Sequence, residues 1–530
     1  MKQSKFLKKL KNPTLYNSDL KKVKIIQTHI SYVAITNNFA YKIKKPIDFG
    51  FLDFSTLEKR KYFCEEEIKL NRRLCPEIYL DVVSITRKND ELELNGSGEI
   101  IDYAVKMKKF SQDFILDKLI KKNQIDEKII DKIVDILVNF YKSTKSTDEI
   151  KNFGTAKAVK YNTDENFEQT KEFIDITIER NIFEFIKKTT NEFLLVNKNF
   201  FNHRAQNGFI KDCHGDLHSG NIVILDNKKI CIFDCIEFNH RFRYADVASD
   251  IAFLSMDLDF LGQPYLSSYL IEKYIEKSKD KNMFYVLNFY KCYRAYVRGK
   301  VTSFKLNDPN IDKIQREEIT KVAKKYFNLA YYYAQLFSRE IKKHVKPVLF
   351  ITTGLTGTGK TTIARKLAVD YNAGIISSDI IRKEIAGIDK YERHHDAYNT
   401  GLYSPENMKQ TYDKIFEKAD FFLKKQRNVV LDATFKTEEL RKKAKKLSEK
   451  NNACFINIYC NCPKKKVKEY LESRVEKKSV SDGRWEIYVK QKKSFEKPEN
   501  NDFIEIDVSK NNFKCQLDVF QNVIKKIHEE

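Results

Sequence analysis

Gly354-Leu355-Thr356-Gly357-Thr358-Gly359-Lys360-Thr361 is the stretch that decides the fold of the C-terminal half. It follows the apolar run 348–351, and an apolar pattern with helical spacing continues through residues 363–368. A buried strand, a glycine-rich turn and a helix are therefore expected in succession. Backbone N–H groups of such a turn, together with the following helix N-terminus, can surround a phosphate group. The stretch predicts a phosphate-binding loop of the Walker A type.

The chemistry of a bound triphosphate assigns roles within this loop. Lys360, also a catalytic candidate, places a mobile positive charge near the β- and γ-phosphates, and the Thr361 hydroxyl is a ligand for Mg²⁺. The alternative is a glycine-rich turn that binds nothing. It fits less well, because four fixed positions coincide with the required strand and helix. The predicted nucleotide-binding residues are Gly354, Leu355, Thr356, Gly357, Thr358, Gly359, Lys360, Thr361 and Thr362.

Two further strand patterns in this half end in an acidic residue. The run 428–432 ends at Asp432, which would hold a Mg²⁺-bound water as in a Walker B strand. The run 374–379 delivers Asp379, with Arg382 one helical turn later. Asp379 could activate an acceptor hydroxyl and Arg382 could hold an anionic group, or Asp379 could simply cap a helix. Strands that alternate with helices predict an α/β domain with a parallel sheet.

Arginines between the last strand patterns suggest a mobile lid. Arg474 and Arg484, the latter within the segment 481–486, could stabilise charge that develops on a transferred phosphoryl group. Arginines exposed on the surface would give the same pattern, and both interpretations stay open.

Length and composition set the broader class. A chain of 530 residues with 42% hydrophobic content predicts several globular domains. No apolar run is long enough to cross a membrane and the ten cysteines are scattered, so we expect a cytoplasmic protein with reduced thiols. The net charge of +23 would suit a nucleic acid, but the lysines are spread along the chain, which favours compositional bias.

The N-terminal half opens with strand patterns over residues 23–45, in which Lys42 and Lys44 point to the same face. A capping box at residues 55–58 then starts a helix that is predicted to reach about residue 74. Glu67 lies in the apolar stripe of that helix and needs a cationic partner. Lys42 is the candidate, Lys44 the second choice, and Glu66 the alternative acid.

A second polar constellation lies near residues 214–234. Asp216 and Asn221 are five residues apart, and Asp234 follows a later short strand. This is the order of a kinase catalytic loop and its metal-binding aspartate. Asp216 would be the base that accepts the proton of an acceptor hydroxyl, and Asn221 and Asp234 would be ligands of Mg²⁺. An ordinary turn with a capping aspartate is the alternative.

This constellation resembles the motif of aminoglycoside phosphotransferases and related small-molecule kinases over about residues 20–340. The resemblance implies an α+β, protein-kinase-like domain at residues 1–345, with a small lobe at about 20–110, a helical lobe at about 111–345 and a hinge at 103–109. Lys42 and Glu67 would then belong to the nucleotide site. Residues 1–49 contain no glycine, so the glycine-rich loop of protein kinases is missing.

Residues 347–510, within a predicted second domain at 346–530, resemble small P-loop kinases such as gluconate kinase, polynucleotide kinase and zeta-toxin-type kinases. The joined arrangement resembles bacterial bifunctional proteins that combine an aminoglycoside phosphotransferase with an ATP-binding AAA-family ATPase. We therefore expect an ATP- and Mg²⁺-dependent phosphotransferase with two nucleotide sites and a small-molecule hydroxyl acceptor. The alternatives are a kinase of nucleic-acid 5′ ends and a nucleotide-dependent regulatory protein whose N-terminal lobe is not catalytic.

Overall fold

The computed structural model describes residues 3–16, 23–226, 228–341, 345–389, 392, 400–473, 483–498, 503–509 and 513–529. It divides into two compact units: Met1–Asn162 with Asn197–Asp257, and Thr163–Val196 with Leu258–Glu530. The predicted boundary at 345/346 falls between the last long helix and the first strand of the C-terminal sheet. The helices of residues 258–341 nevertheless belong to the same compact unit as that sheet.

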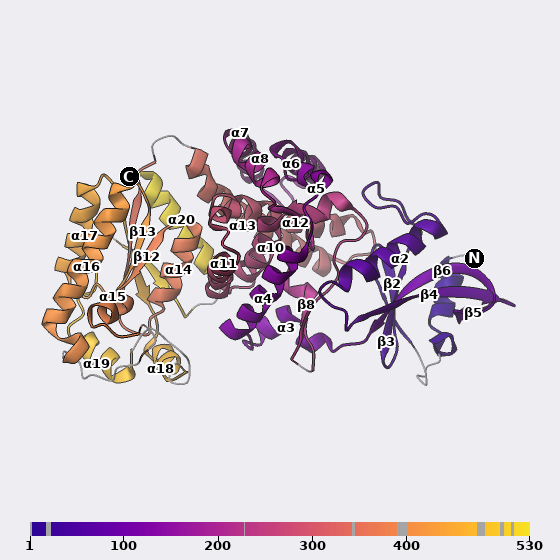
Figure 1. Ribbon diagram of the computed structural model, residues 1–530, viewed down its shortest axis with the longest axis horizontal. Coiled ribbons are helices and arrows are strands. Elements are labelled where there is room, and N and C mark those ends of the chain that lie inside the picture. The colour runs from indigo at the N-terminus through magenta and orange to yellow at the C-terminus, as the bar shows by residue number, and fades with distance from the viewer. Residues whose placement is uncertain are drawn as a thin grey trace. The chain divides into compact units, whose positions relative to one another are not determined.

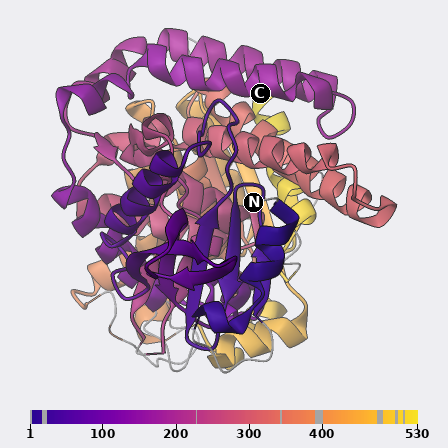
Figure 2. The same cartoon turned by 90° about the vertical axis from the view of Figure 1, so that its right-hand side faces the viewer.

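The first unit is built on a six-stranded antiparallel sheet of order β1-β2-β3-β6-β4-β5. Alternating side chains give the sheet one apolar face, which the N-terminal helix α1 and the short helix η1 cover (Figure 2). Leu10, Leu15 and Tyr16 pack there against Tyr32 and Tyr41. The bounds are α1 Gln3–Leu10, η1 Pro13–Tyr16, β1 Lys24–Gln27, β2 Ser31–Ile35, β3 Phe39–Lys44, β4 Tyr79–Lys88, β5 Glu91–Leu94 and β6 Glu99–Lys108.

Helix α2, Leu57–Asn71, connects β3 to β4. Its N-cap is Thr56, whose hydroxyl accepts from the backbone N–H of Lys59, so the cap lies one residue later than a box that begins at Ser55 would place it. The helix ends before Pro76, as the sequence predicts, although three residues earlier than expected. Glu67 on this helix is completely buried.

The rest of the first unit is mainly helical, with short strands that carry the predicted catalytic loop. The antiparallel pairs β7–β10 and β8–β9 flank residues 213–221 and 233–234. The bounds are η2 Gln112–Phe114, α3 Leu116–Lys121, α4 Glu127–Ser143, α5 Asp148–Asn152, α6 Ala156–Thr170, α8 Lys198–Gln206, β7 Ile210–Asp212, η4 Ser219–Asn221, β8 Ile222–Ile224, β9 Ile230–Ile232, α9 His240–Arg243, β10 Tyr244–Asp246 and α10 Val247–Phe260. The last residues of α6 and of α10 already belong to the second unit.

The second unit contains long helices and a five-stranded sheet. All strand pairs of the sheet are parallel, in the order β12-β13-β11-β14-β15, which confirms the predicted α/β P-loop fold. Figure 1 shows α16 and α17 on one side of β12 and β13, and α14 and α20 on the other. The bounds are η3 Lys171–Phe173, α7 Arg180–Val196, α11 Pro264–Ser278, η5 Lys281–Met283, α12 Phe284–Phe304, η6 Lys305–Asn307, α13 Lys313–Ile341, β11 Val348–Thr353, α14 Lys360–Asp370, β12 Gly374–Ser377, α15 Ser378–Ile385, η7 Gly401–Tyr403, α16 Pro405–Lys424, β13 Val429–Asp432, α17 Glu438–Lys450, β14 Cys454–Asn461, α18 Lys464–Ser473, α19 Trp485–Lys493, β15 Ile504–Asp507 and α20 Phe513–Glu529.

A buried ionic network joins α14 to the long helices of the same unit. Lys366 on α14 donates to Asp370 at 2.6 and 2.5 Å, and Asp370 also accepts from the Tyr332 hydroxyl of α13 at 2.5 Å. Asp259 accepts from Lys291 of α12 at 2.9 Å and lies 3.8 Å from Lys366. Because these groups are almost wholly removed from water, each charge depends on its partners.

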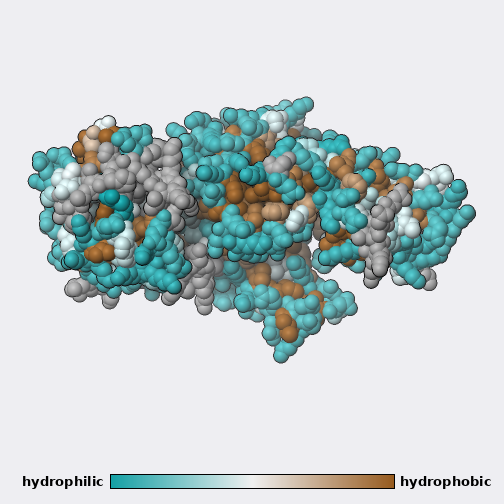
Figure 3. Space-filling model, turned by 90° about the horizontal axis from the view of Figure 1, so that it is seen from below, coloured by the Kyte–Doolittle hydropathy of each residue, from teal (hydrophilic) through white to brown (hydrophobic). Residues whose placement is uncertain are grey.

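The surface is mostly polar on the face shown in Figure 3, with separate apolar patches. Within the described part of the chain, no helix combines the length and the apolar character needed to cross a bilayer.

Candidate functional site

Three glycines shape the loop between β11 and α14. Gly354, Gly357 and Gly359 have φ angles of +143°, +78° and +83°, in the region that favours glycine. A side chain at Gly354 would also lie 2.6 Å from the Cys460 carbonyl oxygen. Gly359 is the N-cap of α14, so the loop leads directly into the helix N-terminus. The backbone thus has the conformation that brings N–H groups and a helix end to one phosphate site.

The polar and charged side chains of the loop bond to the loop itself and to β13. Lys360 Nζ donates to the Leu355 carbonyl at 2.8 Å, so its ammonium group folds over the loop. Thr361 Oγ1 donates to Asp432 Oδ2 at 2.8 Å, which brings together two predicted Mg²⁺ ligands from different elements. Burial raises the pKa of Asp432, and Lys360 opposes that shift. Thr362, the next residue of α14, is half-buried.

A cleft of about 680 Å³, open to solvent, extends from the loop along the carboxyl ends of the strands. Asp379 lies in its wall and pairs with Arg382 at 2.8 Å, and the Arg382 guanidinium stacks over the Tyr403 ring at 4.4 Å. Asp379 is in the first turn of α15, whose N-cap is Ser377, so it is not the capping residue. The cleft is lined by Thr356, Gly357, Gly359, Lys360, Thr361, Ser378, Asp379, Arg382, Tyr403, Met408, Asp432, Ala433, Thr434, Gly483, Ile487 and Gln491.

The predicted lid is described in part. Arg474 lies outside the described residues, as do residues 481–482. Arg484 precedes α19 as its N-cap residue, and Gly483 beside it lines the cleft. Gln491 of α19 accepts from the Thr356 backbone N–H at 3.0 Å, so this helix touches the phosphate-binding loop. Sequence reasoning missed Tyr403, Met408 and Gln491, because no motif or spacing marks them.

A second cluster of charged groups lies in the first unit. Lys42 Nζ is 2.8 Å from both Glu67 and Asp234, which links β3, α2 and the segment after β9. Lys44 Nζ lies 2.7 Å from the other Glu67 oxygen and also bonds to Glu237. Both lysines therefore reach Glu67, as their shared face predicts. Glu237 was missed, although its position three residues after Asp234 and the need of Lys44 for a second acid could have indicated it.

Exposure separates the two lysines. The Lys42 side chain is 15% exposed, whereas Lys44 is 1% exposed, so Lys42 is the one that a ligand can reach. Burial would raise the pKa of Glu67, but the two lysines outweigh it and lower the pKa to about 2. Burial lowers the Lys42 pKa less than Asp234 and Glu67 raise it. Glu66, the alternative acid, pairs with the exposed Lys69.

The loop after β7 brings Asp216 and Asn221 together. Asn221 Nδ2 donates to Asp216 Oδ2 at 2.9 Å and to the Asp216 carbonyl at 3.0 Å. The buried Asp250 accepts from the backbone N–H groups of His214 and Gly215, which fixes the start of the loop. Asp234 has a φ of +63°, an uncommon conformation for a residue with a side chain.

Both clusters suit Mg²⁺ bound together with nucleotide phosphates. The donors are hard oxygen groups: Thr361 and Asp432 in one cluster, and Asn221 and Asp234 in the other. Among the described residues, no group of three or more His, Cys, Asp or Glu side chains could hold a metal ion. The two donor pairs, Thr361 with Asp432 and Asn221 with Asp234, each fit Mg²⁺, which proteins bind through one or two carboxylates while phosphates and water supply the other ligands.

Comparison with known proteins places similarity in both halves. Residues 349–498 match a protein family described as AAA domain. An uncharacterised protein of Mycobacterium tuberculosis and another of Mycobacterium bovis are each 27% identical over 439 residues, which is 83% of this chain and 84% of the relative.

Solved structures are similar at low identity. A gluconokinase from Sinorhizobium meliloti is 15% identical with a TM-score of 0.26, and the match covers 35% of this chain and 98% of that protein. An APS kinase from Mycobacterium tuberculosis is 15% identical with a TM-score of 0.26, covering 35% and 99%. An amicoumacin kinase is 10% identical with a TM-score of 0.38, covering 62% and 94%.

Proposed function

We propose that this protein is an ATP- and Mg²⁺-dependent phosphotransferase with a nucleotide site in each of its two units. The C-terminal site would transfer the terminal phosphoryl group to a hydroxyl of a small molecule. The observation that carries the proposal is the 2.8 Å contact between Thr361 and Asp432 beside the folded-over Lys360, with Asp379 in the same cleft. The proposed nucleotide-binding loop and the candidate base thereby line the same cleft.

In the C-terminal cleft, different side chains would bind the phosphates, hold the metal ion and accept the proton. The loop N–H groups and Lys360 would bind the phosphates, and Thr361 and Asp432 would hold the metal ion, which neutralises charge on the phosphates when bound. Asp379 would accept the proton of the attacking hydroxyl. Arg382, paired with Asp379 and stacked on Tyr403, would hold that carboxylate in position.

In the first unit we propose a kinase-like site. Lys42, paired with Glu67, would bind phosphate oxygens, Asn221 and Asp234 would hold Mg²⁺, and Asp216 would be the base. The Lys42–Asp234 contact supports this assignment, because it joins a phosphate-binding candidate to a metal-binding candidate. The turn between β1 and β2, which carries no glycine, closes within residues 28–31 through hydrogen bonds of Thr28.

A regulatory role of the first unit is the second candidate. Lys42 and Asp234 are already paired with each other, so a nucleotide and its metal ion would exchange with that contact when they bind. A unit of this kind could report nucleotide occupancy without turnover. We favour catalysis because Asp216 is 34% exposed and thus open to an acceptor.

The test measures ADP release from MgATP for the wild type, Lys360→Met, Asp216→Asn and the double variant. Each is assayed alone and with pools of sugars, aminoglycosides or 5′-hydroxyl oligonucleotides. If there are two sites, each single variant should remove a separate, acceptor-stimulated part of the ADP release. The part that depends on Asp216 should fall by roughly 10²- to 10⁴-fold in Asp216→Asn. Lys424→Met and Asp113→Asn, both at exposed positions, are the matched controls.

Three results would change the proposal. Full activity of the double variant would refute phosphotransfer at these sites. Loss through Lys360→Met alone would favour the regulatory role of the first unit. Phosphate that arrives only on oligonucleotides would replace the small-molecule acceptor by a nucleic-acid end.

A further inference from the structure

Helix α2 contacts the segment 234–237 at successive turns. In its C-terminal third, Glu67 reaches this segment through Lys42, which bonds to Asp234. One turn later, Asn71 Oδ1 accepts from the Cys235 backbone N–H at 2.8 Å, while Asn71 Nδ2 donates back to the Glu67 carbonyl at 2.8 Å. The Asn71 side chain, itself held by the helix backbone, thus ties α2 to the residue that follows the metal-binding candidate.

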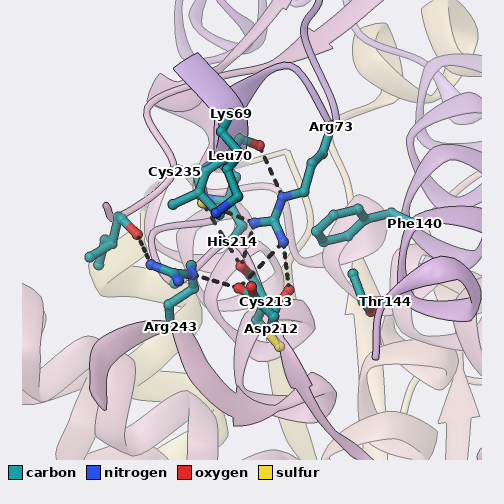
Figure 4. A network of polar contacts seen from close by, with 12 residues as sticks. Lys69, Leu70, Arg73, Phe140, Thr144, Asp212, Cys213, His214, Cys235 and Arg243 are labelled. Carbon is teal, nitrogen blue, oxygen red and sulfur yellow. Dashed lines mark hydrogen bonds and ion pairs between the residues drawn. The ribbon is translucent and has the colours of Figure 1, made fainter. Parts of the chain in front are cut away.

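Arg73, just beyond the end of α2, makes the third contact, shown in Figure 4. Its guanidinium donates to the carbonyl oxygens of Asp212 and Cys213, each at 3.2 Å, and to Cys235 Sγ at 3.3 Å. Its Nε donates to the Leu70 carbonyl at 3.0 Å, and the group lies 5.0 Å from the centre of the Phe140 ring. One planar cation therefore joins the helix end to both backbone segments of the site.

The carboxylate of Asp212 completes this network. It lies 3.3 Å from Arg73 and 2.5 Å from Arg243, whose Nη1 also donates to the Ile236 carbonyl at 2.8 Å. Asp212 precedes Asp216 by four residues, and Ile236 follows Asp234 by two. The two arginines hold the start of the catalytic loop and the residues after Asp234 at a fixed spacing.

We infer that Arg73 is a positioning residue for the first-unit site. It fixes the helix that carries Glu67 onto the two segments that carry Asp216 and Asp234, so the phosphotransfer groups are assembled before nucleotide binds. The inference rests on the proposed function of that site. Lysine in its place would offer one compact ammonium group, which cannot span two carbonyls, a sulfur and a carboxylate.

The experiment uses the full chain and compares Arg73→Met and Arg73→Lys with Arg72→Met. Arg72 is the matched control, because it is the neighbouring arginine but bonds to the carbonyls of Tyr79 and Leu80 on β4 and, among the residues that the structure describes, to none in 212–237. Amide hydrogen exchange is measured in peptides that cover residues 210–216 and 234–240. Affinity for MgATP is measured in a Lys360→Met background, which silences the C-terminal site.

Arg73→Met is expected to speed exchange in both peptides about 10-fold and to weaken MgATP binding about 10-fold, as loss of one or two charged hydrogen bonds predicts. Arg73→Lys should fall between this variant and the wild type, and Arg72→Met should stay within about 2-fold of the wild type. If Arg73→Met fails to give a cooperative melt, Arg73→Lys provides the comparison.

Exchange in the two peptides that is the same for the Arg73 and Arg72 variants would overturn the inference. If the Lys360→Met protein binds no MgATP, the proposed first-unit site is refuted, while the exchange data still decide whether Arg73 joins the segments. Normal MgATP binding with fast exchange would show that Arg73 orders the loop without positioning the site, and the inference would fail.

Discussion

Replacing Lys366 by methionine should destabilise the second unit strongly. Lys366 is 4% exposed, pairs with Asp370 on the same helix, and lies 3.8 Å from Asp259. Burial lowers the pKa of Lys366, but Asp259 and Asp370 raise it further, so the ammonium group stays charged. Methionine fills similar space without charge and leaves two buried carboxylates with Lys291 as the lysine that the described residues still place beside them.

The expected cost follows from that imbalance. Removal of one partner from a buried ion pair costs about 3–5 kcal/mol. At roughly 2 °C per kcal/mol for a unit of this size, the melting temperature should fall by about 6–10 °C. Lys366→Met with Asp370→Asn removes one charge of each sign and keeps an acceptor for the Tyr332 hydroxyl. The double variant should therefore recover at least half of the loss.

Thermal and urea unfolding followed by circular dichroism and by tryptophan fluorescence provide the measurement. Trp485 is the chain's single tryptophan and lies in the second unit, so its fluorescence reports that unit. Lys424→Met, at an exposed lysine paired with Asp420, should change stability by less than about 0.5 kcal/mol. A cost below about 1 kcal/mol for Lys366→Met, or a double variant equal to the sum of the single ones, would refute the reasoning.

Three shorter predictions concern the nucleotide sites. Gly359→Ala should weaken ATP binding at least about 10-fold by calorimetry, because φ is +83° and the side chain would meet Val508, whereas Gly387→Ala, left-handed but in open space, should keep the affinity. Glu67 has a pKa lowered to about 2, so its stabilisation is complete above about pH 4.5 and is lost as pH falls towards 2; Glu67→Gln should flatten that part of the pH–stability curve. Asp432→Asn, measured in a Lys42→Met background that removes the proposed first-unit site, should make ATP affinity nearly equal with Mg²⁺ and with EDTA, and a retained Mg²⁺ dependence would argue against its role as a ligand.

Local patterns predicted much of the fold. The glycine loop, the strands ending at Asp432 and near Asp379, and the alternation of helices led to the parallel sheet, because these signals depend on neighbours in sequence. The pairing of Glu67 with lysines followed from an acid in an apolar stripe. The start of α2 differed by one residue because Ser55 and Thr56 are both good caps, and only the backbone geometry selects between them.

Contacts between distant segments could not be predicted in this way. Arg73 meets residues about 140 and 160 positions away, and nothing in its local pattern sets it apart from Arg72. Tyr403 and Gln491 reach the cleft because tertiary packing brings them there. The division into units also depends on packing. A boundary at 345/346 separates residues by their order in the chain, whereas packing puts the helices of residues 258–341 in one unit with the C-terminal sheet.

The discontinuous second unit has a consequence for synthesis on the ribosome. Helix α7 buries Phe193 against Phe289 of α12 and Phe337 of α13, which are translated 96 and 144 residues later. Because the ribosome adds roughly 5–20 residues per second, the apolar side of α7 stays without its partner helices for several seconds or longer during synthesis. A nascent chain arrested before α12 should therefore bind holdase chaperones through α7, and the same chain extended beyond α13 should release them.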